Sequence, residues 1–104
     1  MDSVFKALAN PGRRALLDQL YHRNGQTLGQ LCRHLDMTRQ GATKHLALLV
    51  QANLVIPLWR SREKLHYLNP APIKEIIGGW LDKYPERIPT ALDELERGLE
   101  EGAE

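Results

Sequence analysis

The chain has 104 residues, of which 42% are hydrophobic and 26% are charged, and its formal net charge is +1 at pH 7. This length suits one globular domain, and no apolar run approaches the roughly 20 residues that a membrane span needs. The single cysteine cannot form an internal disulfide, and the first residues lack the basic start and apolar block of a secretory signal. We therefore expect one domain, residues 1–104, in the cytoplasm and without a membrane partner.

The charge is distributed unevenly along the chain. Residues 33–69 carry six basic side chains and two acidic ones, whereas residues 70–104 carry four basic and nine acidic side chains. A basic middle and an acidic C-terminal third suggest a polyanionic partner for the middle segment.

Two helices are expected before residue 25. Asp2 or Ser3 can cap the first, and Asn10 followed by Pro11 favours the start of the second, because the N–H that proline lacks would be unpaired there. An asparagine–glycine pair at residues 24–25 should end the second helix. Apolar positions at helical spacing support both helices: Val4, Phe5, Leu8, Leu16, Leu17 and Leu20.

Residues 27–51 have the pattern of a helix-turn-helix. Thr27 and Thr38 can cap two short helices, and Asp36 occupies a turn position that needs a left-handed backbone, which aspartate tolerates. Cys32 and Ala42 provide small side chains where the two helices would cross, so we expect Cys32 to be buried by packing.

The second of these helices has one apolar face and one polar face. With Ala42, Leu46 and Leu49 directed inward, the step of about 100° per residue places the polar side chains on the other side. That polar face has no acid, and arginine, glutamine, threonine and lysine can hydrogen-bond to base edges or phosphates in a major groove. The expected DNA-contacting residues of this segment are Thr38, Arg39, Gln40, Thr43, Lys44 and His45. A solvated amphipathic helix is the alternative interpretation.

A β-hairpin is expected at residues 54–69, because two short apolar segments flank a charged turn. Pro57 suits an edge strand. Arg60, Arg62 and Lys64 gather near the tip, where a basic hairpin could lie along a DNA backbone or enter the minor groove. Charged hairpin tips also occur for solubility alone.

The C-terminal part is expected to form one or two helices after the proline-rich break at residues 69–72. Residues 73–84 carry a wide apolar stripe, and a final helix carries Leu92, Leu95 and Leu99. The fold class is therefore mainly α with a small β-hairpin: four helices, the hairpin, then one or two helices.

Three segments together resemble the ArsR/SmtB family of small bacterial winged helix-turn-helix repressors: FKALANPGRRALLDQL, TLGQLCRHLDMTRQGATKHLALLVQANLV and REKLHYLNP. The resemblance covers about residues 4–84 and implies a homodimeric transcriptional repressor that binds double-stranded DNA at a partly palindromic operator. It also implies dimerisation through the first and last helices, residues 1–9 and 73–100. The residues that we expect in this dimer interface are Val4, Phe5, Leu8, Ile73, Ile77, Trp80, Leu81 and Tyr84.

The family's metal-binding motifs are missing. The segment that aligns with its cysteine box, residues 27–31, contains no thiol, and residues 73–84 contain no histidine. Cys32 and His34 lie about 200° apart on a helix, so they cannot jointly hold one ion. We expect no metal site and no cofactor.

Three alternatives compete with a DNA-binding repressor that lacks the family's metal sites. An enzyme is disfavoured because no phosphate-binding glycine loop, paired metal-ligand motif or nucleophile elbow appears. A winged-helix module for protein–protein contact remains open, and so does a redox-responsive regulator that senses through Cys32. An inducer of unknown identity is the remaining possible partner.

Overall fold

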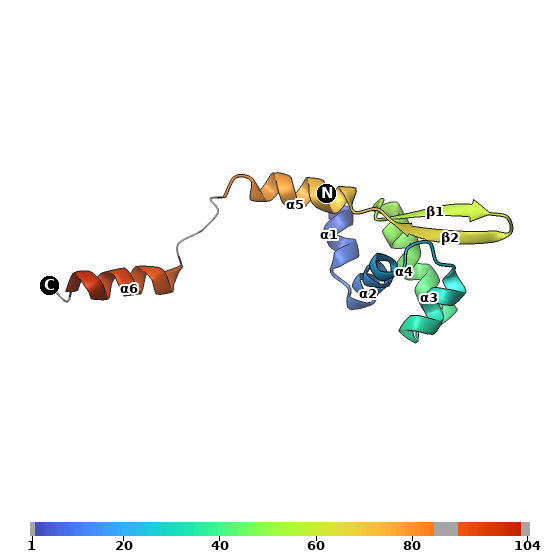
Figure 1. Cartoon of the computed structure of the whole chain (residues 1–104), viewed down its shortest axis with the longest axis horizontal. Helices are drawn as coiled ribbons and strands as arrows, with labels where there is room; N and C mark the ends of the chain where they lie inside the picture. Colours follow the sequence, from blue (N-terminus) through green and yellow to red (C-terminus); the bar gives the residue numbers. More distant parts are fainter. Residues whose placement is uncertain (1, 85–89, 103–104) are drawn as a thin grey trace.

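The structure, a computed structural model, describes residues 2–84 and 90–102. Helices and strands follow the expected order, and the mainly α fold with one hairpin is confirmed (Figure 1). The elements are α1 (Asp2–Leu8), α2 (Pro11–His22), α3 (Leu28–Leu35), α4 (Arg39–Gln51), β1 (Val55–Arg60), β2 (Glu63–Leu68), α5 (Ala71–Leu81) and α6 (Ala91–Gly102).

Side-chain caps start the helices where the sequence predicts them. Asn10 Oδ1 accepts hydrogen bonds from the backbone N–H groups of Gly12 and Arg13, which begins α2. Thr27 forms a capping box with Gln30 at the start of α3, satisfying two N–H groups that the helix itself cannot pair. α2 ends at His22, slightly before the predicted end at residues 24–25.

The helix-turn-helix turn is confirmed. Asp36 adopts the left-handed conformation, with φ 52° and ψ 45°, and its N–H bonds to the Cys32 carbonyl. Thr38 then caps α4. Cys32, which we expected to be buried by packing, is only half-buried. The preceding residue, Leu31, faces the core and has no exposed surface. Cys32 is the next residue on the helix and therefore points about 100° away from that direction.

The core lies between α1, α2, α3, α4 and the base of the hairpin. Its completely buried members come from four different elements or their connections: Leu16 and Leu20 of α2, Leu31 of α3, Leu49 of α4 and Leu54 before β1. Because α4 contributes to this core, its outer face is held in a fixed orientation.

α1 is attached by two arginines of α2. Arg13 donates from Nε to the Ala7 carbonyl at 2.8 Å and from a guanidinium nitrogen to the Lys6 carbonyl at 2.9 Å. Arg14 donates to the Leu8 carbonyl at 2.7 Å. These carbonyls lie at the end of α1, where helix carbonyls lack intrahelical partners, although that of Lys6 also accepts from the Ala9 N–H at 3.3 Å. The arginines thus bind the end of α1 and fix it against α2.

The two strands pair antiparallel, with Pro57 opposite His66. The backbone N–H and carbonyl of His66 both bond to Gln26, on the side away from β1. Pro57 therefore faces a position where no N–H is required, and its lack of one costs no ladder hydrogen bond. A two-residue turn, whose first residue Ser61 has φ 58°, closes the hairpin.

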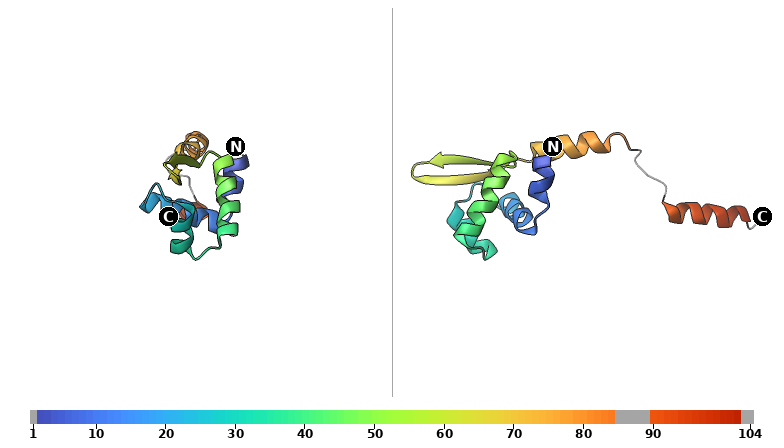
Figure 2. Two further views of the ribbon diagram at one scale, coloured as in Figure 1. Left: turned by 90° about the vertical axis from the view of Figure 1, so that its right-hand side faces the viewer. Right: turned by 180° about the vertical axis from the view of Figure 1, so that it is seen from behind.

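The C-terminal helices lie away from this core. α5 has no fully buried residue, although Ile73 and Ile76 pack against the core from its first half. α5 ends at Leu81, earlier than the predicted 84, so Tyr84 follows the helix. α6 has the predicted leucine stripe and stands apart from the other elements in Figure 1 and in the right view of Figure 2.

Candidate nucleic-acid interface

The polar face of α4 is exposed as the sequence predicts. Ala42 and Leu49 have no exposed surface, and Leu46 is 5% exposed. On the opposite side, the side chains of α4 are open to solvent, namely Arg39, Gln40, Thr43, Lys44 and Ala47. This face carries two cations, one amide and one hydroxyl group.

The first turn of α4 favours an anion. Thr38 Oγ1 accepts a hydrogen bond from the Gly41 N–H at 3.0 Å, and no acidic residue lies in this turn. The remaining N–H groups of the turn and the positive end of the helix dipole point outward. Thr38 itself is exposed, and its hydroxyl proton is available for a further acceptor.

The Thr43 hydroxyl is already engaged within the helix. It donates to the Arg39 carbonyl at 2.6 Å, so its proton is used and its oxygen can still accept. A base amino group or the methyl group of thymine would therefore suit Thr43 better than a phosphate oxygen.

His45 lies differently from the other predicted DNA contacts on α4. It is half-buried, and its Nδ1 is 3.4 Å from a guanidinium nitrogen of Arg13. A guanidinium only donates, so Nδ1 accepts. A side chain added at Gly12 would come within 3.1 Å of Nε2, so the ring packs against the start of α2. His45 is thus directed toward the body of the domain and does not share the exposed face of Gln40, Thr43 and Lys44. Its predicted contact with DNA stays a prediction.

The hairpin presents its basic residues to solvent. Arg60, Arg62 and Lys64 are all exposed. The ammonium group of Lys64 lies 6.0 Å from the ring centre of Trp59, which is its partner across the strands. Trp59 is 70% exposed and was not among the site residues predicted from the sequence. The sequence offered one indication of its role: Trp59 lies two positions after Pro57 on β1, so both side chains are on the same face of the strand.

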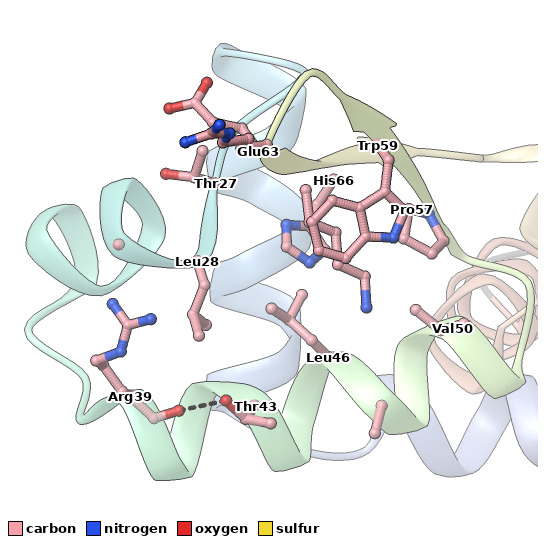
Figure 3. A pocket seen from close by; sticks show the side chains of 14 residues that line it. Thr27, Leu28, Arg39, Thr43, Leu46, Val50, Pro57, Trp59, Glu63 and His66 are labelled. Atoms are coloured by element: carbon pink, nitrogen blue, oxygen red, sulfur yellow. Dashed lines mark hydrogen bonds between the residues drawn. The ribbon is translucent and has the colours of Figure 1, made fainter.

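A groove of about 680 Å³ separates the hairpin from α3 and α4 (Figure 3). Four predicted DNA-contacting residues line it: Arg39, Thr43, Arg62 and Lys64. The other lining residues are Thr27, Leu28, Gly29, Leu46, Ala47, Val50, Pro57, Trp59, Glu63 and His66. The fold thus brings the start of α4 and the hairpin together around one groove. Thr38, Gln40, Lys44, His45 and Arg60 are not among its lining residues.

His66 connects the hairpin to the loop before α3. Its Nδ1 donates to the Gln26 carbonyl at 2.9 Å, since a carbonyl only accepts. Burial lowers the pKa of His66 from the ordinary value of 6.5; the hydrogen bond to Gln26 acts in the opposite direction, and Lys64 lowers it further. The net effect favours the neutral form of the imidazole.

The predicted dimer-forming residues differ in their exposure. Large apolar surfaces are open at Phe5, Ile77, Trp80, Leu81 and Tyr84. Val4 is only 5% exposed because it belongs to the core of its own chain, so its assignment to an interface is corrected. Leu8 and Ile73 are half-buried against that core.

Residues 2–84 and 90–102 contain no group of three or more histidine, cysteine, aspartate or glutamate side chains placed to hold a metal ion. Among the same residues, no helix has the length and apolarity to cross a membrane.

Comparison with known proteins identifies relatives that regulate transcription. A family described as a helix-turn-helix domain matches residues 8–57. The uncharacterized HTH-type transcriptional regulator YuzN of Bacillus subtilis is 36% identical over 78% of this chain and 95% of its own. The transcriptional repressor SdpR of Bacillus subtilis is 28% identical over 79% of this chain and 90% of its own.

Solved structures agree with these relatives. The crystal structure of an ArsR family transcriptional regulator matches with a TM-score of 0.67 and 27% identity, over 79% of this chain and 82% of that one. A possible transcriptional regulator for arsenical resistance matches with a TM-score of 0.67 and 26% identity, over 97% of this chain and 96% of that one. These relatives are DNA-binding regulators and not enzymes. The chain belongs to the ArsR family of winged helix-turn-helix transcriptional regulators.

Proposed function

We propose that this protein is a homodimeric, sequence-specific DNA-binding repressor that acts in the cytoplasm without the metal sites of its family. The observation that carries the proposal is the exposed, acid-free face of α4, with Arg39, Gln40, Thr43 and Lys44, beside a hairpin with exposed cations. An ordinary surface helix usually mixes acids with bases, whereas this face matches the charge of DNA.

Each side chain on this face suits a particular contact. In the proposed complex, α4 lies in the major groove, where arginine recognises guanine and glutamine recognises adenine. Arg39 and Gln40 are the base-contacting candidates near the start of the helix. Lys44, Thr38 and the first-turn N–H groups are placed for phosphates, and Arg60, Arg62 and Lys64 for the adjacent backbone.

Dimerisation is supported by the exposed apolar side chains of α1 and α5. Phe5, Ile77, Trp80 and Leu81 are each at least 37% exposed, which leaves a large apolar surface on a small protein. A twofold dimer would cover this surface and present two copies of α4 to half-sites about one helical turn, or roughly 34 Å, apart. A partly palindromic operator follows from that symmetry.

A repressor role is supported by the relative SdpR, whose name states that function. A metal-independent mode is supported by the absence of thiols from the start of α3, residues 27–31, and of histidines from residues 73–84. Any signal that releases the DNA would then have to act elsewhere on the molecule.

The test begins with selection of binding sites from a pool of random duplexes, followed by fluorescence anisotropy titrations. We expect an enriched motif with twofold symmetry, and an affinity for it that falls steeply with salt because phosphate contacts release counterions. Absence of an enriched motif at micromolar protein would contradict the proposal.

Two substitutions separate base contacts from phosphate contacts. Arg39→Ala should reduce affinity for the selected site by about tenfold and relax its sequence preference, as loss of a base contact costs about 1–3 kcal/mol. Arg62→Ala should weaken binding to all sequences alike and reduce the salt slope by about 1. Lys74→Ala, on the exposed surface of α5, is the matched control for loss of one positive charge. Identical behaviour of all three variants would refute the assigned roles.

A further inference from the structure

The groove between the hairpin and α4 has an apolar interior. Figure 3 shows the Trp59 indole projecting from β1 across the groove, with Leu46 and Val50 of α4 below it and Leu28 of α3 beside them. Pro57 continues this surface along the hairpin. Trp59 lines this groove and is 70% exposed, so most of its indole surface has no protein contact.

Cations surround this apolar interior. Arg39 lines the groove from the start of α4, and Arg62 and Lys64 line it from the hairpin. Glu63 is the one carboxylate among the lining residues. An excess of positive charge around an aromatic and aliphatic interior is complementary to a molecule that combines a flat apolar body with an anionic group.

We propose that this groove binds a small aromatic anion, such as an aromatic carboxylate, and that its binding releases the DNA. The ring would lie between Trp59 and the apolar side chains of α4, and the anionic group would contact Arg39, Arg62 or Lys64. The groove volume of about 680 Å³ falls within the range of roughly 300–1,000 Å³ of small-molecule sites. A DNA backbone would satisfy the cations but would leave the exposed indole of Trp59 without an apolar partner.

Release follows from shared residues, and it rests on the proposed DNA-binding function. Arg39, Thr43, Arg62 and Lys64 line the groove and also belong to the proposed DNA surface. A ligand that contacts these side chains makes them unavailable to DNA. By thermodynamic linkage, bound DNA must lower the affinity for the ligand by the same factor.

The test uses anilinonaphthalene sulfonate, a fluorescent aromatic anion, as the probe. The chain has two tryptophans, so the full-length Trp80→Phe variant leaves Trp59 as the sole tryptophan. We expect the probe to quench Trp59 emission saturably, and the selected DNA to reverse this quenching. The uncharged analogue phenylnaphthylamine should bind about tenfold more weakly, because it lacks the charge-assisted contacts.

Two substitutions in this background test the site itself. Arg62→Ala should lower the affinity for the probe by about tenfold. Val50→Thr, which replaces one methyl group by a hydroxyl group, should weaken binding of the probe several-fold without changing DNA affinity, since Val50 is not placed on the DNA. A thermal melt of each variant checks that it is folded.

The outcomes distinguish this inference from the proposed function. If the protein binds the selected DNA but the probe does not quench Trp59, or quenches it without being displaced by DNA, the ligand site is wrong and DNA binding stands. Equal binding of the uncharged analogue would also overturn the site. If no DNA binds, the proposed function fails, and saturable quenching of Trp59 that Arg62→Ala weakens would still support the groove as an anion site.

Discussion

Thr38 both caps α4 and belongs to the proposed DNA surface, and Thr38→Asp should change stability and DNA affinity in opposite directions. Its Oγ1 accepts the Gly41 N–H at 3.0 Å, and the residue is exposed at the start of α4. Aspartate caps helices as well as threonine or better, so this hydrogen bond is retained. The new charge lies near the positive end of the helix dipole and should add about 0.3–1 kcal/mol to the free energy of unfolding.

DNA binding should change in the opposite direction. A carboxylate about 4 Å from a phosphate costs about 1 kcal/mol in bulk water and about 4 kcal/mol at the effective dielectric constant of a protein surface. Thr38→Asp should therefore weaken DNA binding at least about fivefold at low salt, with a smaller loss at high salt as screening increases. The assays are urea denaturation for stability and anisotropy titration for DNA affinity.

Two matched variants complete the comparison. Thr38→Ser keeps the cap and the hydroxyl and should resemble the wild type in both assays. Thr38→Ala loses the cap and should lower the free energy of unfolding by about 1 kcal/mol. DNA binding by Thr38→Asp as tight as that of the wild type, or a loss of stability together with affinity, would contradict these two roles of Thr38.

Three further predictions concern the core, the dimer and the hairpin. Leu31→Ala should lower the free energy of unfolding by about 2–5 kcal/mol, because Leu31 is completely buried; a loss under about 1 kcal/mol in urea denaturation would contradict this packing. Trp80→Glu should convert the proposed dimer to monomer in sedimentation equilibrium, whereas Tyr21→Glu, at an exposed site on α2, should remain dimeric. The lowered pKa of His66 means that the unfolded chain takes up its proton first as the pH falls below about 6.5, so stability should decrease from there toward the folded pKa and level off below it. His66→Asn, which can still donate to Gln26, should lack this component of the pH dependence. An unchanged pH profile of stability in this variant would show that His66 is not its cause.

Features that depend on neighbouring residues could be predicted from the sequence. Asn10, Thr27 and Thr38 all cap helices, and Asp36 takes the left-handed turn, because each side chain or backbone acts within a few positions of its own. The polar face of α4 was predictable for the same reason, since helical periodicity alone decides which residues share a face.

Features that depend on contacts between distant segments could not be predicted. The orientation of His45 follows from its packing against Gly12 and Arg13, about thirty residues earlier in the chain. The groove under Trp59 arises only where the hairpin comes to lie beside α4. The burial of Val4 similarly depends on how Arg13 and its neighbours hold α1 against the core.

The central claim is that two copies of α4 and the hairpin contact one DNA site in a sequence-specific manner. Hydroxyl-radical footprinting of the wild-type protein on a selected duplex tests it most directly. We expect two protected segments related by twofold symmetry, with centres about one helical turn or roughly 34 Å apart. At a protein concentration near the wild-type dissociation constant, both should be lost in Arg39→Ala. Uniform protection along the duplex, or the same footprint with Arg39→Ala, would contradict it.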